Sequence, residues 1–192
     1  MKELSLYKIK ENALKSERAV FSIQQISSLI SKSKAVSAVY SSRLVKKGLA
    51  VKLIKGRISF SEDYYVIASQ LVEPSYISFH SALLFHGLYK QITKNIECAA
   101  TKNTFFYPKL SIKYHKIPPS LFYGFKKYKK DNSYIFVAEP EKAIIDCVYL
   151  GMLSKQDIED LKSMINRKRM RELIFNFKGR GYKKIMKVLL ND

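Results

Sequence analysis

Lysine, arginine and serine side chains between positions 32 and 57 are the first residues whose types and spacing fit a recognisable chemistry. Lysine and arginine pair with phosphate oxygens, while serine hydroxyls bond phosphates or base edges. Part of the set falls on a predicted helix and the rest on a predicted hairpin. We therefore predict a contact with double-stranded DNA through Lys32, Ser33, Lys34, Ser37, Ser41, Arg43, Lys52, Lys55 and Arg57.

The net charge favours a polyanionic partner. The 192 residues include 35 Lys and Arg against 16 Asp and Glu, which gives a formal charge of +19. Residues 1–60 hold 13 of the basic and 3 of the acidic residues. Neutralising nucleic-acid phosphates releases condensed counterions, a large gain that does not depend on sequence. An anionic membrane surface or a lysine-rich proteome would also account for the charge.

Three helices and a hairpin are predicted to position the DNA-contacting residues. The first helix covers residues 4–15, and the second opens at a capping-box spacing between Ser22 and Gln25. A third helix covers residues 34–47 and ends at Gly48, which suits the position after a helix C-terminus. Two strand-like runs follow, separated by a two-residue turn: 49–54, Lys55-Gly56 and 57–60.

The order of these elements is typical of a winged helix-turn-helix, in which the second helix of the motif enters the major groove. We expect the helix over residues 34–47 to take that role. Val36, Tyr40 and Leu44 are spaced as its buried stripe. Its outward positions would then be Lys34, Ser37, Ala38 and Ser41.

The remainder of the chain predicts a small mixed α/β domain. We expect an α+β protein with a winged helix-turn-helix at residues 1–62 and the second domain at residues 63–192. Strands are predicted over 96–100, 111–117 and 134–137. Helices are predicted over 64–71, after Ser78, after Glu139-Pro140-Glu141, from Ser154 and over 182–190.

Two further basic stretches lie in this second part. Residues 101–130 carry eight lysines and no acidic residue, interleaved with aromatic residues. Such a stretch either stacks unpaired bases or contributes its rings to a core or an interface. A cluster at Arg167, Lys168, Arg169 and Arg171 is either a solvated helix face or a surface for an acidic partner.

Catalytic and metal-binding patterns are weak. His80 and His86 are six residues apart on one predicted helix, and His115 lies by itself in a strand. Glu139, Glu141 and Asp146 resemble a nuclease set only loosely, and helix capping explains the two glutamates. We therefore expect no enzyme activity, no cofactor and no bound metal, and we keep a metal-dependent nucleic-acid-processing enzyme as the less favoured alternative.

The cysteines and the N-terminal segment predict a location in the cell. Cys98 and Cys147 lie in apolar stretches, as buried reduced thiols of cytosolic proteins do. The chain starts without the apolar core of a signal peptide, and no apolar run approaches 18 residues. We expect a soluble, cytoplasmic protein that does not bind membranes.

Four segments resemble the AbiEi antitoxins, which belong to AbiE-type abortive-infection (type IV) toxin–antitoxin systems. The segments at residues 20–26 (VFSIQQI) and 43–49 (RLVKKGL) are similar to the winged-helix start of that family. The segments at residues 74–88 (PSYISFHSALLFHGL) and 137–146 (VAEPEKAIID) resemble signature blocks of the family's body. The resemblance covers about residues 18 to 150.

The resemblance implies a regulator that represses its own promoter through the winged helix. It also implies a second domain that neutralises a nucleotidyltransferase-like toxin, without requiring a stable complex with it. A transcription factor without a toxin is the main alternative. Recognition of a palindromic site would require a homodimer, which the sequence leaves open because it contains no heptad seam.

Overall fold

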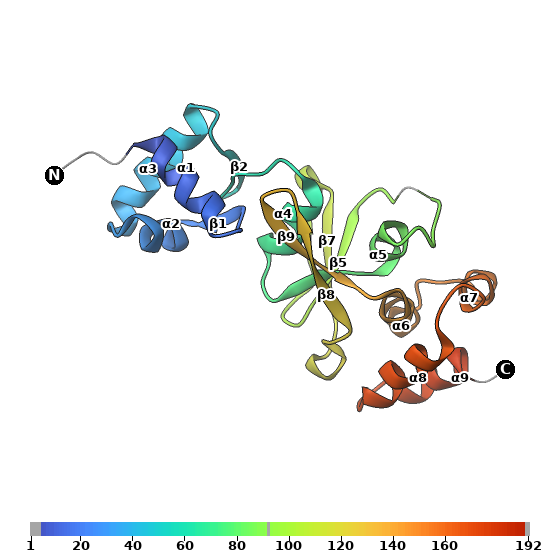
Figure 1. Ribbon diagram of the computed structural model, residues 1–192. Helices are drawn as coiled ribbons and strands as arrows, with labels where there is room; N and C mark the ends of the chain where they lie inside the picture. The colour runs from blue at the N-terminus through green and yellow to red at the C-terminus, as the bar shows by residue number, and fades with distance from the viewer. Residues whose placement is uncertain (1–4, 92, 191–192) are drawn as a thin grey trace. The chain divides into compact units, whose positions relative to one another are not determined.

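The protein has an α+β fold that divides into two compact units. The computed structural model describes residues 5–91 and 93–190 (Figure 1). Unit 1 runs to Leu71 and also takes Tyr128–Ile135, and unit 2 comprises Val72–Lys127 and the chain from Phe136 onward. The division falls beyond the predicted boundary at residue 62, because the helix over residues 64–71 belongs to unit 1.

Unit 1 alternates helices with a small sheet. Its helices are α1 (Leu6–Lys15), α2 (Ile23–Ile30), α3 (Lys34–Lys46) and α4 (Tyr64–Leu71). Its strands β1 (Val20–Ser22), β2 (Val51–Ile54) and β3 (Arg57–Ser59) form an antiparallel sheet in the order β1-β3-β2. The helices and the hairpin expected here are therefore confirmed, whereas β1 was not expected. The predicted helix start at Leu4 lies outside the described residues.

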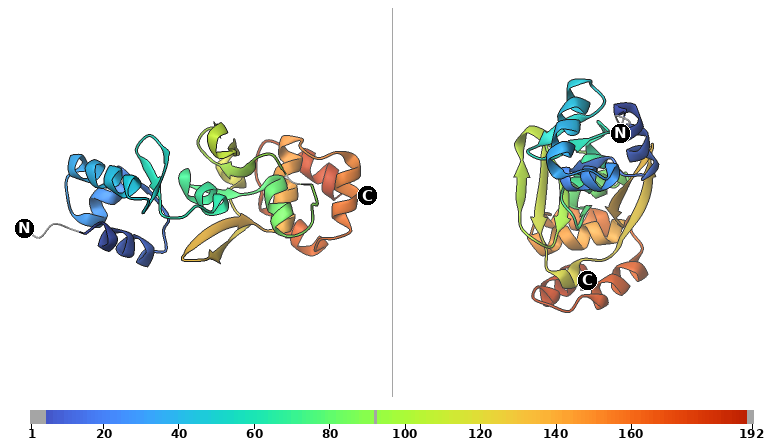
Figure 2. Two further views of the ribbon diagram at one scale, coloured as in Figure 1. Left: turned by 90° about the horizontal axis from the view of Figure 1, so that it is seen from above. Right: turned by 90° about the vertical axis from the view of Figure 1, so that its left-hand side faces the viewer.

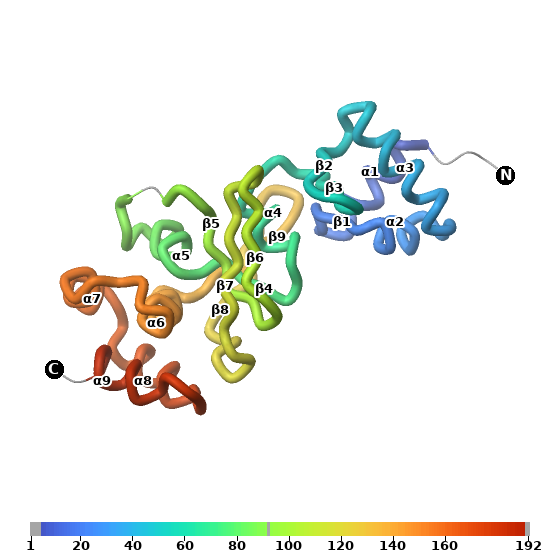
Figure 3. Tube along the Cα trace, turned by 180° about the vertical axis from the view of Figure 1, so that it is seen from behind, coloured from blue at the N-terminus to red at the C-terminus, as the bar shows by residue number. Residues whose placement is uncertain are grey.

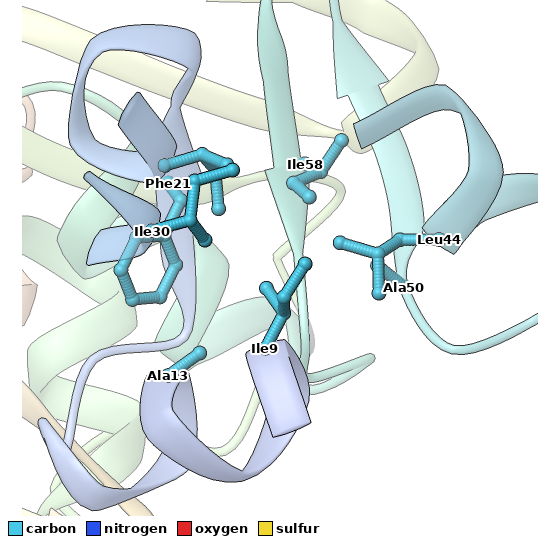
Figure 4. Close-up of a cluster of buried hydrophobic side chains, with 8 residues drawn as sticks. Ile9, Ala13, Phe21, Ile30, Leu44, Ala50 and Ile58 are labelled. Atoms are coloured by element: carbon cyan, nitrogen blue, oxygen red, sulfur yellow. The ribbon is translucent and has the colours of Figure 1, made fainter. Parts of the chain in front are cut away.

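Side chains from helices and strands form one apolar core in unit 1. Ile9 and Ala13 of α1 lie against Phe21 of β1 and Ile58 of β3, with Leu44 of α3 beside them (Figure 4). All five are buried, with at most 4% of their surface exposed. This burial fixes the helices against the sheet, because apolar area removed from water contributes about 25 cal/mol per Å².

Local signals explain where the elements of unit 1 begin and end. The capping box is present: the Ser22 hydroxyl accepts from the Gln25 amide at 3.2 Å, and the Gln25 side chain accepts from the Ser22 amide at 2.8 Å. Ser33 caps α3, and Gly48 follows its end with φ +66°. The β2–β3 turn requires Gly56, whose φ of +74° is strained for residues that carry a Cβ.

The face that α3 buries differs from the predicted one. Val36 is 40% exposed, whereas Ser37 and Ser41 are 0% and 3% exposed. The predicted stripe is therefore wrong at Val36, while Leu44 is buried and the half-buried Tyr40 packs against the core. Both serine hydroxyls bond backbone oxygens one turn earlier, at 2.8 Å in each case. Small side chains let α3 approach its neighbouring helices closely, and these internal bonds remove the cost of burying a hydroxyl.

Unit 2 is built on a mixed sheet in the order β6-β7-β5-β4-β9-β8. Its end strands β6 and β8 are both labelled in Figure 3. Three strands were predicted: β5 (Ile96–Ala100), β7 (Ile112–Lys116) and β9 (Ser133–Ala138). Three were not: β4 (Ser75–Ile77), β6 (Phe105–Tyr107) and β8 (Phe125–Lys130). Two of these have three residues each, too short for an alternating pattern to identify.

Helices form layers on this sheet. The helix α5 (Phe79–Phe85) packs on β5 and on α6 (Pro140–Leu150). Beyond α7 (Lys155–Lys162), the pair α8 (Arg167–Asn176) and α9 (Tyr182–Leu189) packs on α6. Figure 2 shows these C-terminal helices, in orange and red, grouped together. All of these helices were expected except α8, for which a solvated helix face was one of two readings of the basic cluster at residues 167–171.

The buried side-chain amide of Gln70 links the backbone around the start of β1 to residues 128–135, the later segment of the chain that belongs to unit 1. The Gln70 side-chain oxygen accepts from the amides of Ala19 and Val20, at 2.9 and 3.2 Å. Its nitrogen donates to the Ser133 hydroxyl and to the Tyr134 carbonyl, at 2.9 Å each. Gln70 is fully buried, so a side chain without these groups would leave two backbone donors unsatisfied.

Replacing Gln70 by leucine should therefore destabilise the protein. We expect Gln70→Leu to lower the free energy of unfolding by about 2–4 kcal/mol, since each unsatisfied buried group costs about 1–3 kcal/mol. Urea denaturation followed by circular dichroism measures the change. Gln24→Leu is the matched control, because Gln24 is exposed on α2. Equal stability of the two variants would contradict this role.

Candidate nucleic-acid interface

A groove lies between α3 and the β2–β3 hairpin of unit 1. It has a volume of about 400 Å³, and Ile23 of α2 closes one side. The α3 side is formed by Ala38, Ser41, Ser42, Val45 and Lys46, and the hairpin side by Lys52, Ile54, Gly56, Arg57 and Ile58. Three cations from two elements therefore border one groove, and none of the described residues that line it is acidic.

The nine predicted DNA-contacting residues fall into three groups. Lys52 and Arg57 of the hairpin line the groove. Ser33, Lys34, Arg43 and Lys55 are exposed outside its lining, and Lys32 is half-buried. Ser37 and Ser41 are corrected here: both are buried, and their hydroxyls donate to the carbonyls of Ser33 and Ser37. Ser37 is therefore not available to a partner, and Ser41 borders the groove with 3% of its surface exposed.

The face that α3 exposes includes residues that were not predicted to contact DNA. Ala38, Val39, Ser42 and Lys46 are all exposed, and 51% of the surface of Val39 is accessible. The predicted stripe included Val36, which is exposed, and left out Ser37 and Ser41, which are buried. The signal was the spacing of Ser37 and Ser41 with Leu44, since the three positions recur at about the 3.6-residue period of a helix and so share one face.

Two acidic groups of unit 1, Glu11 and Asp63, form ion pairs with residues that do not line the groove. Glu11 accepts from Lys15 at 2.6 Å and Lys8 at 2.9 Å on α1, and these hydrogen bonds lower the pKa of Glu11 to about 2. Asp63 pairs with Lys130 at 3.2 Å. Neither carboxylate lines the groove, so neither forms an ion pair with Lys46, Lys52 or Arg57.

The carboxylates of the nuclease hypothesis have separate partners. Glu139 bonds Arg169 at 2.6 Å and Lys126 at 2.7 Å. Burial raises the pKa of Glu139, but these hydrogen bonds outweigh it and lower the pKa overall. The Glu141 side chain accepts from the Asn166 amide at 2.9 Å. Glu139 occupies the N-cap position of α6 without a side-chain cap bond, so capping was the wrong explanation for it.

Two histidines converge on one glutamate in unit 2. The Glu97 carboxylate lies 3.0 Å from Nδ1 of His80 and 3.1 Å from Nε2 of His115. The sequence suggested that His115 lies by itself in a strand, but the structure places it next to Glu97. Burial raises the pKa of Glu97, but the hydrogen bonds from His115 and His80 lower it to about 2. Among the described residues, no group of three His, Cys, Asp or Glu side chains is arranged to hold a metal ion.

A buried polar network around an ion pair joins the two segments that resemble family signature blocks. Lys142 and Asp146 are one helical turn apart on α6 and form an ion pair with no exposed surface. Tyr76 receives a hydrogen bond from Lys142 at 2.7 Å and donates to Asp146 at 3.0 Å, and Ser78 donates to Asp146 at 2.7 Å. Burial lowers the pKa of Lys142 despite the attraction of Asp146.

This network ties β4 to α6. Tyr76 lies in β4, and Ser78 precedes α5, where its hydroxyl bonds Asp146 and makes no helix-cap bond. The pair has no accessible surface through which a substrate could reach it. We therefore assign the network to the stability of unit 2.

Breaking the ion pair from one side should be costly. We expect Lys142→Met to lower the free energy of unfolding by about 3–5 kcal/mol, because it leaves an uncompensated carboxylate in the core. Urea denaturation measures it. Lys15→Met is the control, since it breaks an exposed one-turn pair with Glu11 and should change stability little. A similar small effect in both variants would contradict the assignment.

Within the described part of the chain, no helix combines the length and the apolar character needed to cross a bilayer. No protein-family model matches the sequence, and no curated protein matches it. The chain is similar in fold to a crystal structure of the RV2827C protein from Mycobacterium tuberculosis, with a TM-score of 0.53 and 12% sequence identity. The similarity covers 98% of this chain and 78% of that one, so the two proteins share an α+β architecture along nearly the full length described here.

Proposed function

We propose that unit 1 is a winged helix-turn-helix module that binds double-stranded DNA, and that the protein is a transcriptional regulator. The order α1, β1, α2, α3, β2, β3 supports this proposal, because it places a hairpin directly after the third helix. In winged helices, the second helix of the motif enters the major groove while the hairpin contacts flanking phosphates.

The observation that carries the proposal is the groove that joins α3 to the hairpin. Lys46, Lys52 and Arg57 border it from both elements. A duplex phosphate chain seated between them would meet cations on both sides, and each neutralised phosphate releases counterions. Lys34 and Lys55 extend the positive surface to the start of α3 and to the tip of the hairpin.

Base reading would fall to the exposed face of α3. Ala38 and Val39 present methyl groups, which suit the methyl group of thymine in the major groove. Ser42 offers a hydroxyl, and Arg43 a guanidinium that lies 5.9 Å from the Tyr40 ring centroid. Arginine is the side chain that most often pairs with guanine. This set replaces the buried Ser37 and Ser41 as the reading residues.

We further propose that the protein acts as the antitoxin of an AbiE-like system. The support is the resemblance of residues 74–88 and 137–146 to that family's signature blocks. These blocks supply all four members of the buried network: Tyr76, Ser78, Lys142 and Asp146. The need to keep this network satisfied would explain why these residue types occur together in the two blocks.

Neutralising two groove cations should weaken duplex binding. We expect Lys46→Gln/Lys52→Gln to reduce the slope of log K against log salt by about 2 for the DNA upstream of the coding sequence, at about 0.9 for each phosphate that is no longer neutralised. Fluorescence anisotropy between 50 and 200 mM salt provides the slope. The control Lys8→Gln/Lys15→Gln removes the same charge from α1 and should leave the slope unchanged. Equal slopes for both double variants would overturn the proposed interface.

The antitoxin role makes a separate genetic prediction. We expect a neighbouring gene to encode a nucleotidyltransferase-like protein that arrests growth when expressed alone. Co-expression of this chain should restore growth, and Lys46→Gln/Lys52→Gln should retain that rescue because the resemblance places neutralisation in the second domain. Colony counts on inducing medium are the measurement. If co-expression does not restore growth but the protein still binds the duplex, the antitoxin role is wrong and the protein is a transcription factor without a toxin.

A further inference from the structure

The helix pair α8–α9 concentrates positive charge far along the sequence from the proposed DNA-binding module. Residues 166–190 contain nine Lys and Arg and one acidic residue, Glu172. By contrast, residues 131–165 contain three basic and seven acidic residues. The excess is therefore local to these two helices and not a general property of unit 2.

Most of these cations have no partner within the described chain. Arg169 bonds Glu139 and Glu172, and Lys184 donates to the Tyr149 carbonyl at 3.3 Å. The other seven form no hydrogen bond or ion pair with any described residue, and all seven are exposed: Arg167, Lys168, Arg171, Lys178, Arg180, Lys183 and Lys187. Grouping like charges without counter-charges raises the free energy of the unbound protein, and a polyanion relieves it.

A hollow at the α8–α9 connection combines these cations with aromatic rings. It has a volume of about 730 Å³, within the range of about 300–1,000 Å³ that is typical of ligand pockets. Lys178, Arg180, Lys183 and Lys184 line it together with Phe175 and Tyr182. Phe175 is 57% exposed, and its ring has no aromatic partner among the described residues.

The hollow is held in shape by the core beneath it. Phe177 is buried and meets the Tyr149 ring edge-on, with centroids 6.2 Å apart. A Cβ at Gly181 would lie 2.8 Å from the Tyr149 ring, so the connection lies directly against α6. Ile185 of α9 is fully buried below. The cations and the exposed ring therefore project from a fixed support.

We propose that the α8–α9 surface binds single-stranded nucleic acid. Cations spread over two helices follow a chain of phosphates, and an exposed phenylalanine among them offers a face on which an unpaired base stacks. A duplex keeps its bases stacked on one another and would leave Phe175 unused. The proposal does not depend on unit 1 and adds a second ligand to the one proposed there.

The absence of tryptophan from the sequence allows a direct test in the full-length protein. Phe175→Trp introduces a single indole at the proposed stacking position. We expect 12-nucleotide oligo(dT) and oligo(rU) to quench its emission on binding, and comparison of the two identifies the preferred sugar. Phe106→Trp is the matched control, since Phe106 is 52% exposed in β6 and lies in the other basic stretch of unit 2.

Affinity measurements on charge variants complete the test. We expect Lys178→Gln/Arg180→Gln/Lys183→Gln to weaken oligonucleotide binding at least tenfold in fluorescence anisotropy. Lys90→Gln/Lys94→Gln/Lys155→Gln removes the same charge from exposed positions of unit 2 outside α8 and α9, and it should bind as the wild type does. Phe175→Ala should weaken binding about tenfold, the value of one stacked base.

Three outcomes would overturn the proposal. The first is quenching in the Phe106→Trp variant and none in the Phe175→Trp variant, which would move the surface to β6. The second is equal affinity of both triple variants, which would leave only net charge as the cause. The third combines two results: polyglutamate at equal charge concentration displaces the oligonucleotide, and the oligonucleotide does not quench the indole emission of the Phe175→Trp variant. That result would indicate an acidic protein partner.

A failure of this proposal is distinguishable from a failure of the proposed duplex interface. The Lys46→Gln/Lys52→Gln variant should bind oligonucleotides as the wild type does, because both changes lie in the groove of unit 1. Weakened oligonucleotide binding in that variant would assign the single strand to unit 1 and contradict the role of α8 and α9.

Discussion

The close packing of α3 through Ser37, Ser41 and Leu44 is the constraint on which the candidate interface depends. Serine is small enough to let the helix approach the core, and each hydroxyl is satisfied by a carbonyl one turn earlier. Once that face is buried, Ala38, Val39, Ser42 and Lys46 must point outward. The groove between α3 and the hairpin, with cations on both sides, follows from this orientation.

Unit 2 depends on a different kind of interaction. The Lys142–Asp146 pair, with Tyr76 and Ser78, is a fully satisfied polar network within an apolar core. Such a network costs free energy to bury and specifies one arrangement, because any other register of α6 against β4 would leave charges without partners. Of the three carboxylates in the nuclease hypothesis, Asp146 belongs to this network, whereas Glu139 and Glu141 bond other partners.

The charge of the protein divides between two tasks in our interpretation. The cations of unit 1 line a groove that suits a duplex, whereas those of α8 and α9 surround an exposed aromatic ring that suits an unpaired base. A common electrostatic attraction would operate at both, since counterion release does not distinguish the two ligands. The difference lies in shape and in the aromatic surface, and these separate the two proposals experimentally.

The sequence by itself determined the α+β class, the capping box at Ser22, the end of α3 at Gly48 and the hairpin turn at Lys55-Gly56. These features depend on residues within a few positions of one another, so local patterns report them. Only the tertiary structure decided which face of α3 is buried, that Glu97 joins His80 to His115, and that β4, β6 and β8 complete the sheet. Each of these depends on contacts between residues distant in the chain, and the free energy of such contacts overrides the periodicity of a short segment.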